Sequence, residues 1–411
     1  MDQQPRPAAD ELFTIVQEYK GGGKPVPCGD LVDFLLDQKN RAKDGVVLFD
    51  EMCWRMLGKG MPLMRANLSI GTLHPQIQGV GFRWWRERAV TEEFRVRHGI
   101  QHAKDYQESP IRQVIEQGIT FRQHLGPDAD IDRYPLLVSF RKSGATDYLA
   151  CPLKMFVGRM SVVTWTTDHP GGFTEDHIAM IQSVLPALAV VVEAKALQRM
   201  NSNLLDIYLG RTIGRHILNG EVLRGQGQKL RAVMMAVDLR GFTALSDRLP
   251  GDALIALLND YFEAVTAPVH ARGGEILKFI GDGVLAMFEI NPRSEQEAAE
   301  DGLNAGLEAL GRLEALNELR RAAGRDLIHI GIGLHIGEMI YGNVGASDRL
   351  DFTAIGPSVN LVCRLESLTK RLERPLLVSE AFARTYGKPL VSLGFHPLRG
   401  LSEPQEAFAP R

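Results

Sequence analysis

The chain has 411 residues, which is too long for one ordinary hydrophobic core and predicts two or three domains. Apolar residues make up 45% and charged residues 24%, which is the balance of a globular, soluble protein. The formal net charge of −3 creates no overall basic field, so the composition argues against nucleic acid or an anionic membrane surface as a partner.

The four cysteines are far apart and lack metal-ligand spacing, so we expect buried free thiols in a reducing compartment: Cys28, Cys53, Cys151 and Cys363. The first residues are polar and form no targeting signal. The most apolar stretch, residues 178–197, contains Pro186, Glu193 and Lys195, whereas a membrane span needs about 20 predominantly apolar residues. We therefore expect a buried or dimerising helix, no membrane insertion and a cytoplasmic protein.

Residues 1–27 are rich in Pro and Gly and predict a flexible tail with one short helix over residues 9–19. The next segment, residues 28–192, has the mixed patterns of an α+β domain. Helical periodicity covers residues 30–57 on both sides of Gly45, and another helix begins at Pro110. Runs of strand-forming residues predict strands over residues 65–72, 79–86, 146–153 and 159–167.

The end of this domain consists of a strand, a turn at Gly158, a second strand and a GGFT turn into a helix that Thr174 is expected to cap. This pattern resembles a GAF-type sensor domain. The resemblance implies an α/β fold with a pocket for a small ligand or other regulator, which the sequence does not name. Four residues are candidates to line a pocket, although core and surface positions explain them better: Trp84, Trp85, His98 and His102.

Residues 193–229 predict a helical linker, within a helix that begins near Phe173 and ends near Asn219. Its apolar residues alternate at three- and four-residue spacing, as in a coiled-coil seam: Leu197, Met200, Leu204 and Ile207. A helix that packs on its own domain is the alternative.

The C-terminal segment, residues 230–411, places two carboxylates at strand ends. A buried strand over residues 232–237 ends in Asp238. The run over residues 275–288 predicts a β-hairpin whose glycine-flanked turn presents Asp282. An Asp in a turn is ordinary by itself, but two carboxylates at neighbouring strand ends are typical of sites for divalent cations and phosphate.

Further helices are expected over residues 252–265, 295–322 and 357–368. Strands over residues 329–335 and 338–344 are expected to pair across Gly337.

Four motifs occur in order in this segment: AVDLRGFTALSDRLP (236–250), GGEILKFIGDGVLAMF (273–288), GIGLHIGEMIYGNVG (331–345) and DFTAIGPSVNLVCRLE (351–366). Together they resemble the catalytic domain of the class III nucleotidyl cyclases. The resemblance implies a βαββαβ fold that works as a head-to-tail homodimer, with active sites at the subunit interface. In such a dimer, the coiled-coil linker would set subunit orientation, and a sensor ligand would bias it.

The resemblance also implies roles for individual residues. Asp238, Asp282 and the Leu239 carbonyl would bind two Mg²⁺ or Mn²⁺ ions. The backbone of Gly241, Phe242 and Thr243 would contact the phosphates. On one helix face, Asn360 would orient the ribose and Arg364 would stabilise the transition state. Arg399 stands where the family usually has a phosphate-binding Lys.

Base selection would depend on Lys278 and Thr353. Adenine presents an acceptor at N1 and a donor at N6, and a Lys donor with a hydroxyl acceptor matches that pattern. The expected reaction is therefore conversion of ATP to 3′,5′-cyclic AMP and pyrophosphate. Guanylate cyclases of the family typically carry Glu and Cys or Ser at these two positions, and a guanylate cyclase is the nearest alternative.

Two positions depart from the family pattern: Pro357 replaces an Asp or Asn, and Glu338 stands where some relatives have Arg. A catalytically inactive regulatory protein is the rival of a different class, but such proteins usually lose a metal-binding Asp or the catalytic Arg. A diguanylate cyclase is disfavoured because Ile276 and Leu277 follow Gly273-Gly274-Glu275, where its signature has acidic and Phe residues.

Overall fold

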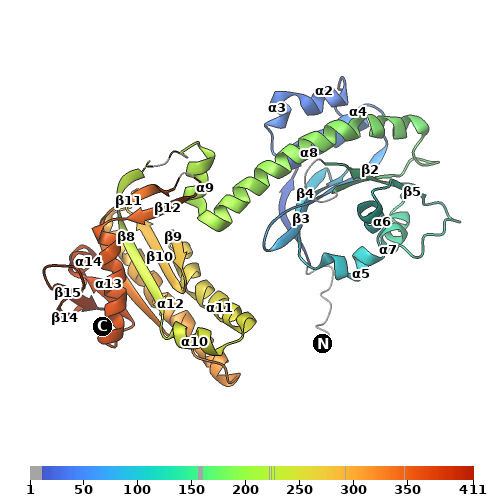
Figure 1. Ribbon diagram of the computed structural model, residues 1–411. Helices are drawn as coiled ribbons and strands as arrows, with labels where there is room; N and C mark the ends of the chain where they lie inside the picture. Colours follow the sequence, from blue (N-terminus) through green and yellow to red (C-terminus); the bar gives the residue numbers. More distant parts are fainter. Residues whose placement is uncertain are drawn as a thin grey trace. The chain divides into compact units, whose positions relative to one another are not determined.

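The structure is a computed structural model that describes residues 12–155, 161–221, 223, 225, 227–291, 293–346 and 348–411. The chain divides into two compact units, one up to Leu204 and one from Leu205 onward. Each unit contains one β-sheet with helices packed on it (Figure 1).

The N-terminal unit is built on a seven-stranded sheet in which every neighbouring pair is antiparallel. The spatial order is β1-β4-β3-β2-β7-β6-β5. The strands are β1 (Phe13–Tyr19), β2 (Leu63–Gly71), β3 (Ile77–Trp85), β4 (Val90–Arg97), β5 (Phe121–His124), β6 (Asp147–Leu153) and β7 (Ser161–Thr167). The strands predicted over residues 65–72, 79–86 and 146–153 are confirmed, as is the described part of the strand over 159–167.

Helices cover both faces of this sheet (Figure 1). Ala66 and Leu68 of β2 belong to a core shared with α4 (Gly45–Gly58) and α8 (Glu175–Leu209). The opposite face packs against α6 (Pro110–Gln117) and α7 (Pro135–Lys142). The remaining helices are short: α2 (Leu31–Leu36), α3 (Gln38–Arg41), η1 (Ile100–His102) and α5 (Lys104–Gln107). Since side chains alternate along a strand, Arg65 of β2 lies on the α6–α7 face.

The helix predicted over residues 9–19 of the tail is wrong for its described part. Phe13–Tyr19 is β1 and pairs with β4, because the segment FTIVQEY is rich in β-branched and aromatic residues and the edge of β4 is otherwise unpaired. The sequence patterns did not predict β4, β5 or α7. Residues 9–11 and the turn predicted at Gly158 lie outside the described residues.

The helix predicted from Phe173 to Asn219 is in fact two helices. Thr174 acts as the predicted cap, since its Oγ1 accepts a hydrogen bond from the His177 backbone N–H at 3.3 Å. α8 ends at Leu209 because Gly210 has φ +89°, and α9 (Arg211–Leu218) follows.

By length and composition, α8 could cross a membrane, with a mean hydropathy of 1.7 over its most apolar window, of which 39% is buried. Its side chains contribute to the core of the N-terminal unit: Ile181, Val184, Leu188, Val191 and Val192. This packing favours the core-helix interpretation.

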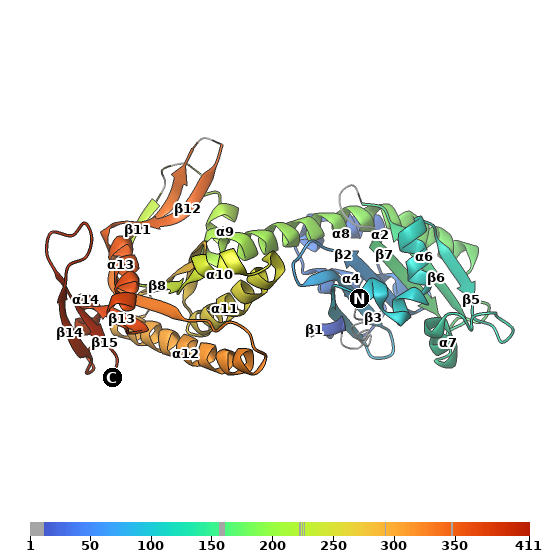
Figure 2. The ribbon, with the colours of Figure 1, turned by 60° about the horizontal axis from the view of Figure 1, so that its bottom comes forward.

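The C-terminal unit has a sheet of order β14-β15-β13-β11-β8-β10-β9, with β12 paired to the end of β11 (Figure 2). The strands are β8 (Gly227–Leu239), β9 (Glu275–Ile280), β10 (Gly283–Glu289), β11 (Ile330–Gly345), β12 (Leu350–Ile355), β13 (Leu376–Ser379), β14 (Val391–His396) and β15 (Gln405–Ala409). The helices are α10 (Phe242–Arg248), α11 (Gly251–Ala271), α12 (Glu295–Ala322), α13 (Pro357–Arg371) and α14 (Glu380–Tyr386). The succession β8, α11, β9, β10, α12, β11 is the predicted βαββαβ order.

Different elements pack on the two faces of this sheet. Val233, Met235 and Val237 of β8 belong to a core shared with α11 and α12. The alternate residues Met234 and Ala236 lie in a second core with side chains of α9, β12 and α13. Because Asp238 continues this second series, it lies on the α13 face of the sheet.

The two strands predicted over residues 329–335 and 338–344 are one continuous strand, β11, so the expected turn at Gly337 is wrong. The glycines of GIGLHIG instead allow α13 to pack closely on β11. A Cβ atom at Gly333 would lie 2.6 Å from the Glu366 nitrogen, and one at Gly337 would lie 2.3 Å from the Ser358 Oγ. Glycine is needed here for close approach rather than for a turn.

The cysteines match the prediction in part. Cys53 and Cys151 are buried free thiols, Cys28 is half-buried and Cys363 is exposed. Cys363 departs from the prediction because its neighbour Val362 takes the sheet-facing position on α13.

Candidate active site

Two carboxylates meet where β8 ends and the β9–β10 hairpin turns. Val284 lies opposite Val237, so the turn brings Asp282 beside Asp238. A Cβ atom at Gly283 would lie 3.5 Å from the Asp238 Oδ1, so the turn lies against this carboxylate. Burial and the nearby charge of Asp282 raise the pKa of Asp238.

This donor set fits a divalent cation. A bound cation relieves the repulsion between two close carboxylates, and Mg²⁺ takes one or two carboxylates with water and phosphate oxygens as its other ligands. The described part of the chain contains no group of three or more His, Cys, Asp or Glu side chains that could hold a metal. Any further ligands must therefore be of another kind, such as backbone carbonyls, water or substrate oxygens.

The backbone after β8 is arranged for an anion. Gly241 adopts φ +75° at the start of α10, and no side chain caps this helix. Gly241 and Thr243 are exposed and Phe242 is half-buried. The first-turn N–H groups are therefore available for the oxygens of a phosphate.

α13 carries two of the predicted catalytic residues on the same face of the sheet as Asp238. Asn360 is exposed and Arg364, one turn later, is half-buried. The guanidinium of Arg364 lies next to the loop that contains Arg399, since its Nη2 would be 3.2 Å from a Cβ atom placed on Gly400. Arg399 itself is exposed.

The two predicted base-selecting residues lie on strands that side chains connect. The ammonium of Lys278 on β9 forms an ion pair with Asp351 on β12, although these strands are not hydrogen-bonded neighbours. Thr353 lies two residues after Asp351 and therefore on the same side of β12. Both Lys278 and Thr353 are half-buried.

Sequence reasoning missed Asp351 and two further residues near the carboxylate pair. Burial and the charge of Asp238 raise the pKa of Glu366 on α13 to about 7. Burial and the charges of Asp238 and Asp282 raise the pKa of Tyr261, whose hydroxyl is buried without a described partner. The four-residue spacing from the apolar Val362 was a signal that Glu366 faces the sheet.

α9 contacts both strands that carry the base-selecting residues. Glu275 of β9 accepts a hydrogen bond from the Thr212 backbone N–H at 3.0 Å, at the N-terminus of α9. His216 of α9 stacks on Phe352 of β12, with ring centroids 5.9 Å apart and an interplanar angle of 15°. α9, which lies within the predicted linker, therefore contacts the strands that carry Lys278 and Thr353.

Comparison with known proteins identifies this region. Residues 227–384 match the family described as adenylate and guanylate cyclase catalytic domain. This segment is a class III cyclase catalytic domain.

Two curated relatives are similar over the same part of the chain. Adenylate cyclase 1 of Rhizobium meliloti is 35% identical over 147 residues, which cover 36% of this chain and 22% of that protein. An adenylate cyclase of Anabaena cylindrica is 30% identical over 169 residues, which cover 40% of this chain and 32% of that protein. The match thus spans less than a third of these relatives. The crystal structure of the adenylyl cyclase CyaB from P. aeruginosa is 30% identical, with a TM-score of 0.42, over 44% of this chain and 94% of that chain.

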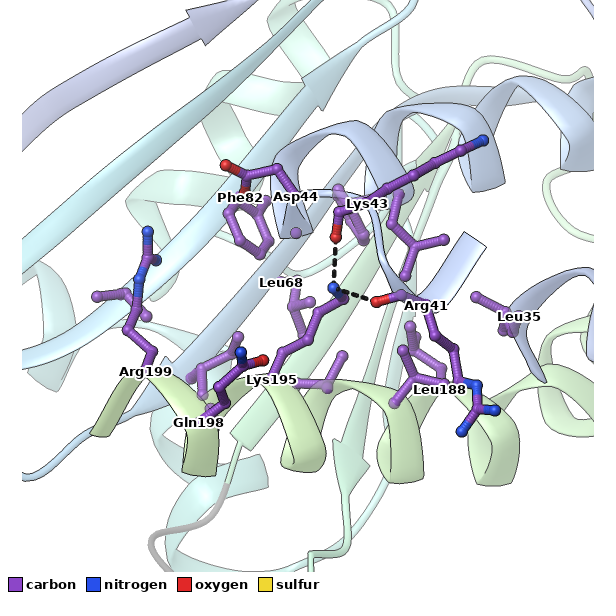
Figure 3. Close-up of a pocket in the computed structure, with 18 of the residues that line it drawn as sticks. Leu35, Arg41, Lys43, Asp44, Leu68, Phe82, Leu188, Lys195, Gln198 and Arg199 are labelled. Carbon is purple, nitrogen blue, oxygen red and sulfur yellow. Dashed lines mark hydrogen bonds between the residues drawn. The ribbon is translucent and has the colours of Figure 1, made fainter. Parts of the chain in front are cut away.

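The N-terminal unit contains a cavity of about 600 Å³ between α8, the α3–α4 connection and the sheet (Figure 3). Its floor is apolar and includes Leu68 and Phe82. The Lys195 ammonium lies in it and donates to the backbone carbonyls of Arg41, at 2.9 Å, and Lys43. The Lys195 ammonium, which could otherwise contact a ligand in this cavity, is thus already hydrogen-bonded within the N-terminal unit.

Proposed function

We propose that the chain is an adenylate cyclase that converts ATP to 3′,5′-cyclic AMP and pyrophosphate. The observation that carries the proposal is the pair Asp238 and Asp282 on a cyclase catalytic domain that also has Lys278 and Thr353 on linked strands. The ribose 3′-oxygen attacks the α-phosphorus, the bond to the bridging oxygen breaks, and pyrophosphate leaves. The proton of the 3′-hydroxyl passes to solvent.

Two Mg²⁺ or Mn²⁺ ions held by Asp238, Asp282 and the Leu239 carbonyl would supply acidification of the 3′-hydroxyl and neutralisation of the triphosphate. The residues of the chain position the substrate. The N–H groups of Gly241, Phe242 and Thr243 bind phosphate oxygens. Asn360 orients the ribose, Arg364 stabilises charge at the α-phosphate, and Arg399 binds the triphosphate.

Adenine is selected by hydrogen bonding. Lys278 donates to N1 and the Thr353 hydroxyl accepts from N6, whereas guanine presents a donor at N1 and an acceptor at O6. Asp351 positions the Lys278 ammonium through their ion pair. A guanylate cyclase is the second candidate, since the matched family includes both activities.

We propose a homodimer in which Asp238 and Asp282 of one subunit act with Lys278, Thr353, Asn360 and Arg364 of the other. Apolar side chains exposed on the catalytic unit support such an interface, including Phe279 (50% exposed) and Ile280 (57%) on β9. Obligate interfaces bury such side chains.

Mixing two inactive variants tests this arrangement. Asp282→Ala and Arg364→Ala disable opposite halves of each shared site, so each alone should be inactive. A 1:1 mixture that exchanges subunits should recover about a quarter of the wild-type activity, because half of the dimers contain one intact site. Absence of recovery in a mixture shown to exchange subunits would place all six residues in one subunit.

The N-terminal unit acts as a cytoplasmic GAF-like sensor in this proposal, and α8 and α9 transmit its state. Exposed apolar residues near the end of α8, Ile207 and Leu209, support a parallel helix pair. Disulfide formation by Met200→Cys or Leu204→Cys in a Cys363→Ser background tests the pair. If neither position forms an inter-subunit disulfide, the parallel pair is wrong.

A further inference from the structure

The sheet of the N-terminal unit has a buried polar row on its α6–α7 face. Arg65 on β2 lies opposite Thr166 on β7, which lies opposite Tyr148 on β6. These residues are 7%, 1% and 0% exposed. The helices above them contribute apolar side chains such as Leu137 and Phe140, so this row is polar in the middle of an otherwise apolar layer.

The guanidinium of Arg65 is enclosed between two aromatic rings. Its central carbon lies 4.8 Å from the ring centroid of Trp85 and 4.9 Å from that of Phe140. These contacts stabilise the cation but provide no ordinary hydrogen-bond acceptor for its N–H groups, so another partner is needed to accept from them.

No described carboxylate forms an ion pair with Arg65. The carboxylate of Glu92 interacts electrostatically with Arg65, but it is ion-paired with Arg83, at 3.7 Å, and with Arg88, at 2.9 Å. Three arginines therefore share one carboxylate in this region. Burial lowers the pKa of Arg65 to about 9, which still leaves it protonated at neutral pH. A buried charge without an ion pair of its own is unfavourable, and this favours a counter-anion here.

Three polar atoms of the row also have no hydrogen bond of normal geometry among the described residues: Arg65 Nε, Thr166 Oγ1 and Tyr148 Oη, the last of which lies near the Thr164 hydroxyl. Buried polar groups in native proteins are nearly always hydrogen-bonded, so unpaired ones on neighbouring strands point to water, an ion or a ligand between them. All three atoms can donate to an anion.

We propose that this row is a binding site for a small organic carboxylate. A planar carboxylate offers two acceptor oxygens that match the N–H groups of a guanidinium. Hydroxyl donors from Tyr148 and Thr166 satisfy its remaining lone pairs. The site lies across the sheet from the cavity of Figure 3 and does not depend on the cyclase activity proposed above.

Thermal unfolding of the purified full-length chain tests the proposal, with acetate, succinate, benzoate and inorganic phosphate added as sodium salts against NaCl of equal ionic strength. A carboxylate at about 100 times its Kd should raise Tm by about 5–10 °C in a unit of this size, saturably. Arg65→Met should abolish the rise, and Tyr148→Phe should weaken it. The matched control is Arg133→Met, because Arg133 also stacks on an aromatic ring, at 4.7 Å from Tyr134, but is exposed.

Extraction of the purified protein followed by mass spectrometry gives an independent readout, in which a co-purified organic acid should be present in the wild type and absent from Arg65→Met. If Arg65→Met does not fold, Thr166→Val takes its place, since it removes a donor at nearly constant volume. A rise with phosphate alone would overturn the carboxylate assignment. No rise with any anion, together with no co-purified acid, would show that water alone satisfies this row.

Discussion

The ammonium of Lys278 on β9 is ion-paired with the carboxylate of Asp351 on β12. The pair joins two strands that share no backbone hydrogen bonds, and it places the proposed adenine-selecting Lys on the same side of β12 as Thr353. Asp351 therefore has a positioning role that its distance in sequence from Lys278 does not indicate.

Asp351→Asn tests this role. Exposed ion pairs contribute about 0.2–1 kcal/mol, so loss of the pair should raise the KM for ATP about two- to fivefold and lower the preference for ATP over GTP similarly. Steady-state kinetics with both nucleotides measures the effect. Asp326→Asn, which breaks a surface pair with Arg248 in the same unit, is the control and should change neither value. Unchanged kinetics in Asp351→Asn would reduce the pair to a surface contact.

Exchange of the base-selecting residues should change the substrate. In the double variant Lys278→Glu with Thr353→Cys, the carboxylate accepts from guanine N1 and the thiol donates to O6. We expect the ratio of kcat/KM for GTP to that for ATP to rise by at least about tenfold, since one good hydrogen-bonded pair discriminates by about 1–3 kcal/mol. A folded double variant that still prefers ATP would show that other residues select the base.

We expect the contact between Glu275 and α9 to affect the rate of catalysis. Its carboxylate accepts the Thr212 N–H at the N-terminus of α9, an interaction of about 0.3–1 kcal/mol for a charged group. Glu275→Gln should therefore lower kcat about two- to fivefold while the KM for ATP changes little. Glu289→Gln, an exposed change on the neighbouring strand β10, is the control. Equal kcat values in the two variants would argue against transmission through α9.

The stability of the catalytic unit should depend on the protonation of His335. This residue is 7% exposed, its Nδ1 lies 2.8 Å from the Ser379 Oγ, and burial lowers its pKa to about 4. Because the unfolded state binds the proton more tightly, stability is fully present above about pH 6.5 and is lost as pH falls toward 4. We expect a loss of about 3 kcal/mol over this window from His335. Denaturant unfolding at several pH values should show a flatter dependence for His335→Gln, and an identical dependence would mean that other groups cause the loss.

Local patterns predicted the elements that carry strong periodicity or turn signals. The β9–β10 hairpin, the carboxylates at its turn and at the end of β8, and α12 over Glu295–Ala322 were all visible in the sequence. These features depend on neighbouring residues only, so a single sequence reveals them.

Features that depend on contacts distant in sequence were missed. The turn expected at Gly337 failed because glycine permits both turns and close packing, and only the position of α13 distinguishes them. Asp351 and Glu366 gain their significance from Lys278 and Asp238, which lie far away in the chain. β1 became a strand because the edge of β4 was available to pair with it.

The most direct test of the account is product formation by the purified full-length chain, with ATP and GTP in parallel and with Mg²⁺ or Mn²⁺. We expect cyclic AMP from ATP with either metal, and loss of at least about a hundredfold in Asp282→Ala, because this change removes one of two carboxylate ligands. Protein folding is checked by thermal unfolding of both proteins. Cyclic GMP as the main product would assign the chain to the guanylate cyclases, and no product from folded, dimeric protein under any of these conditions would contradict the catalytic account.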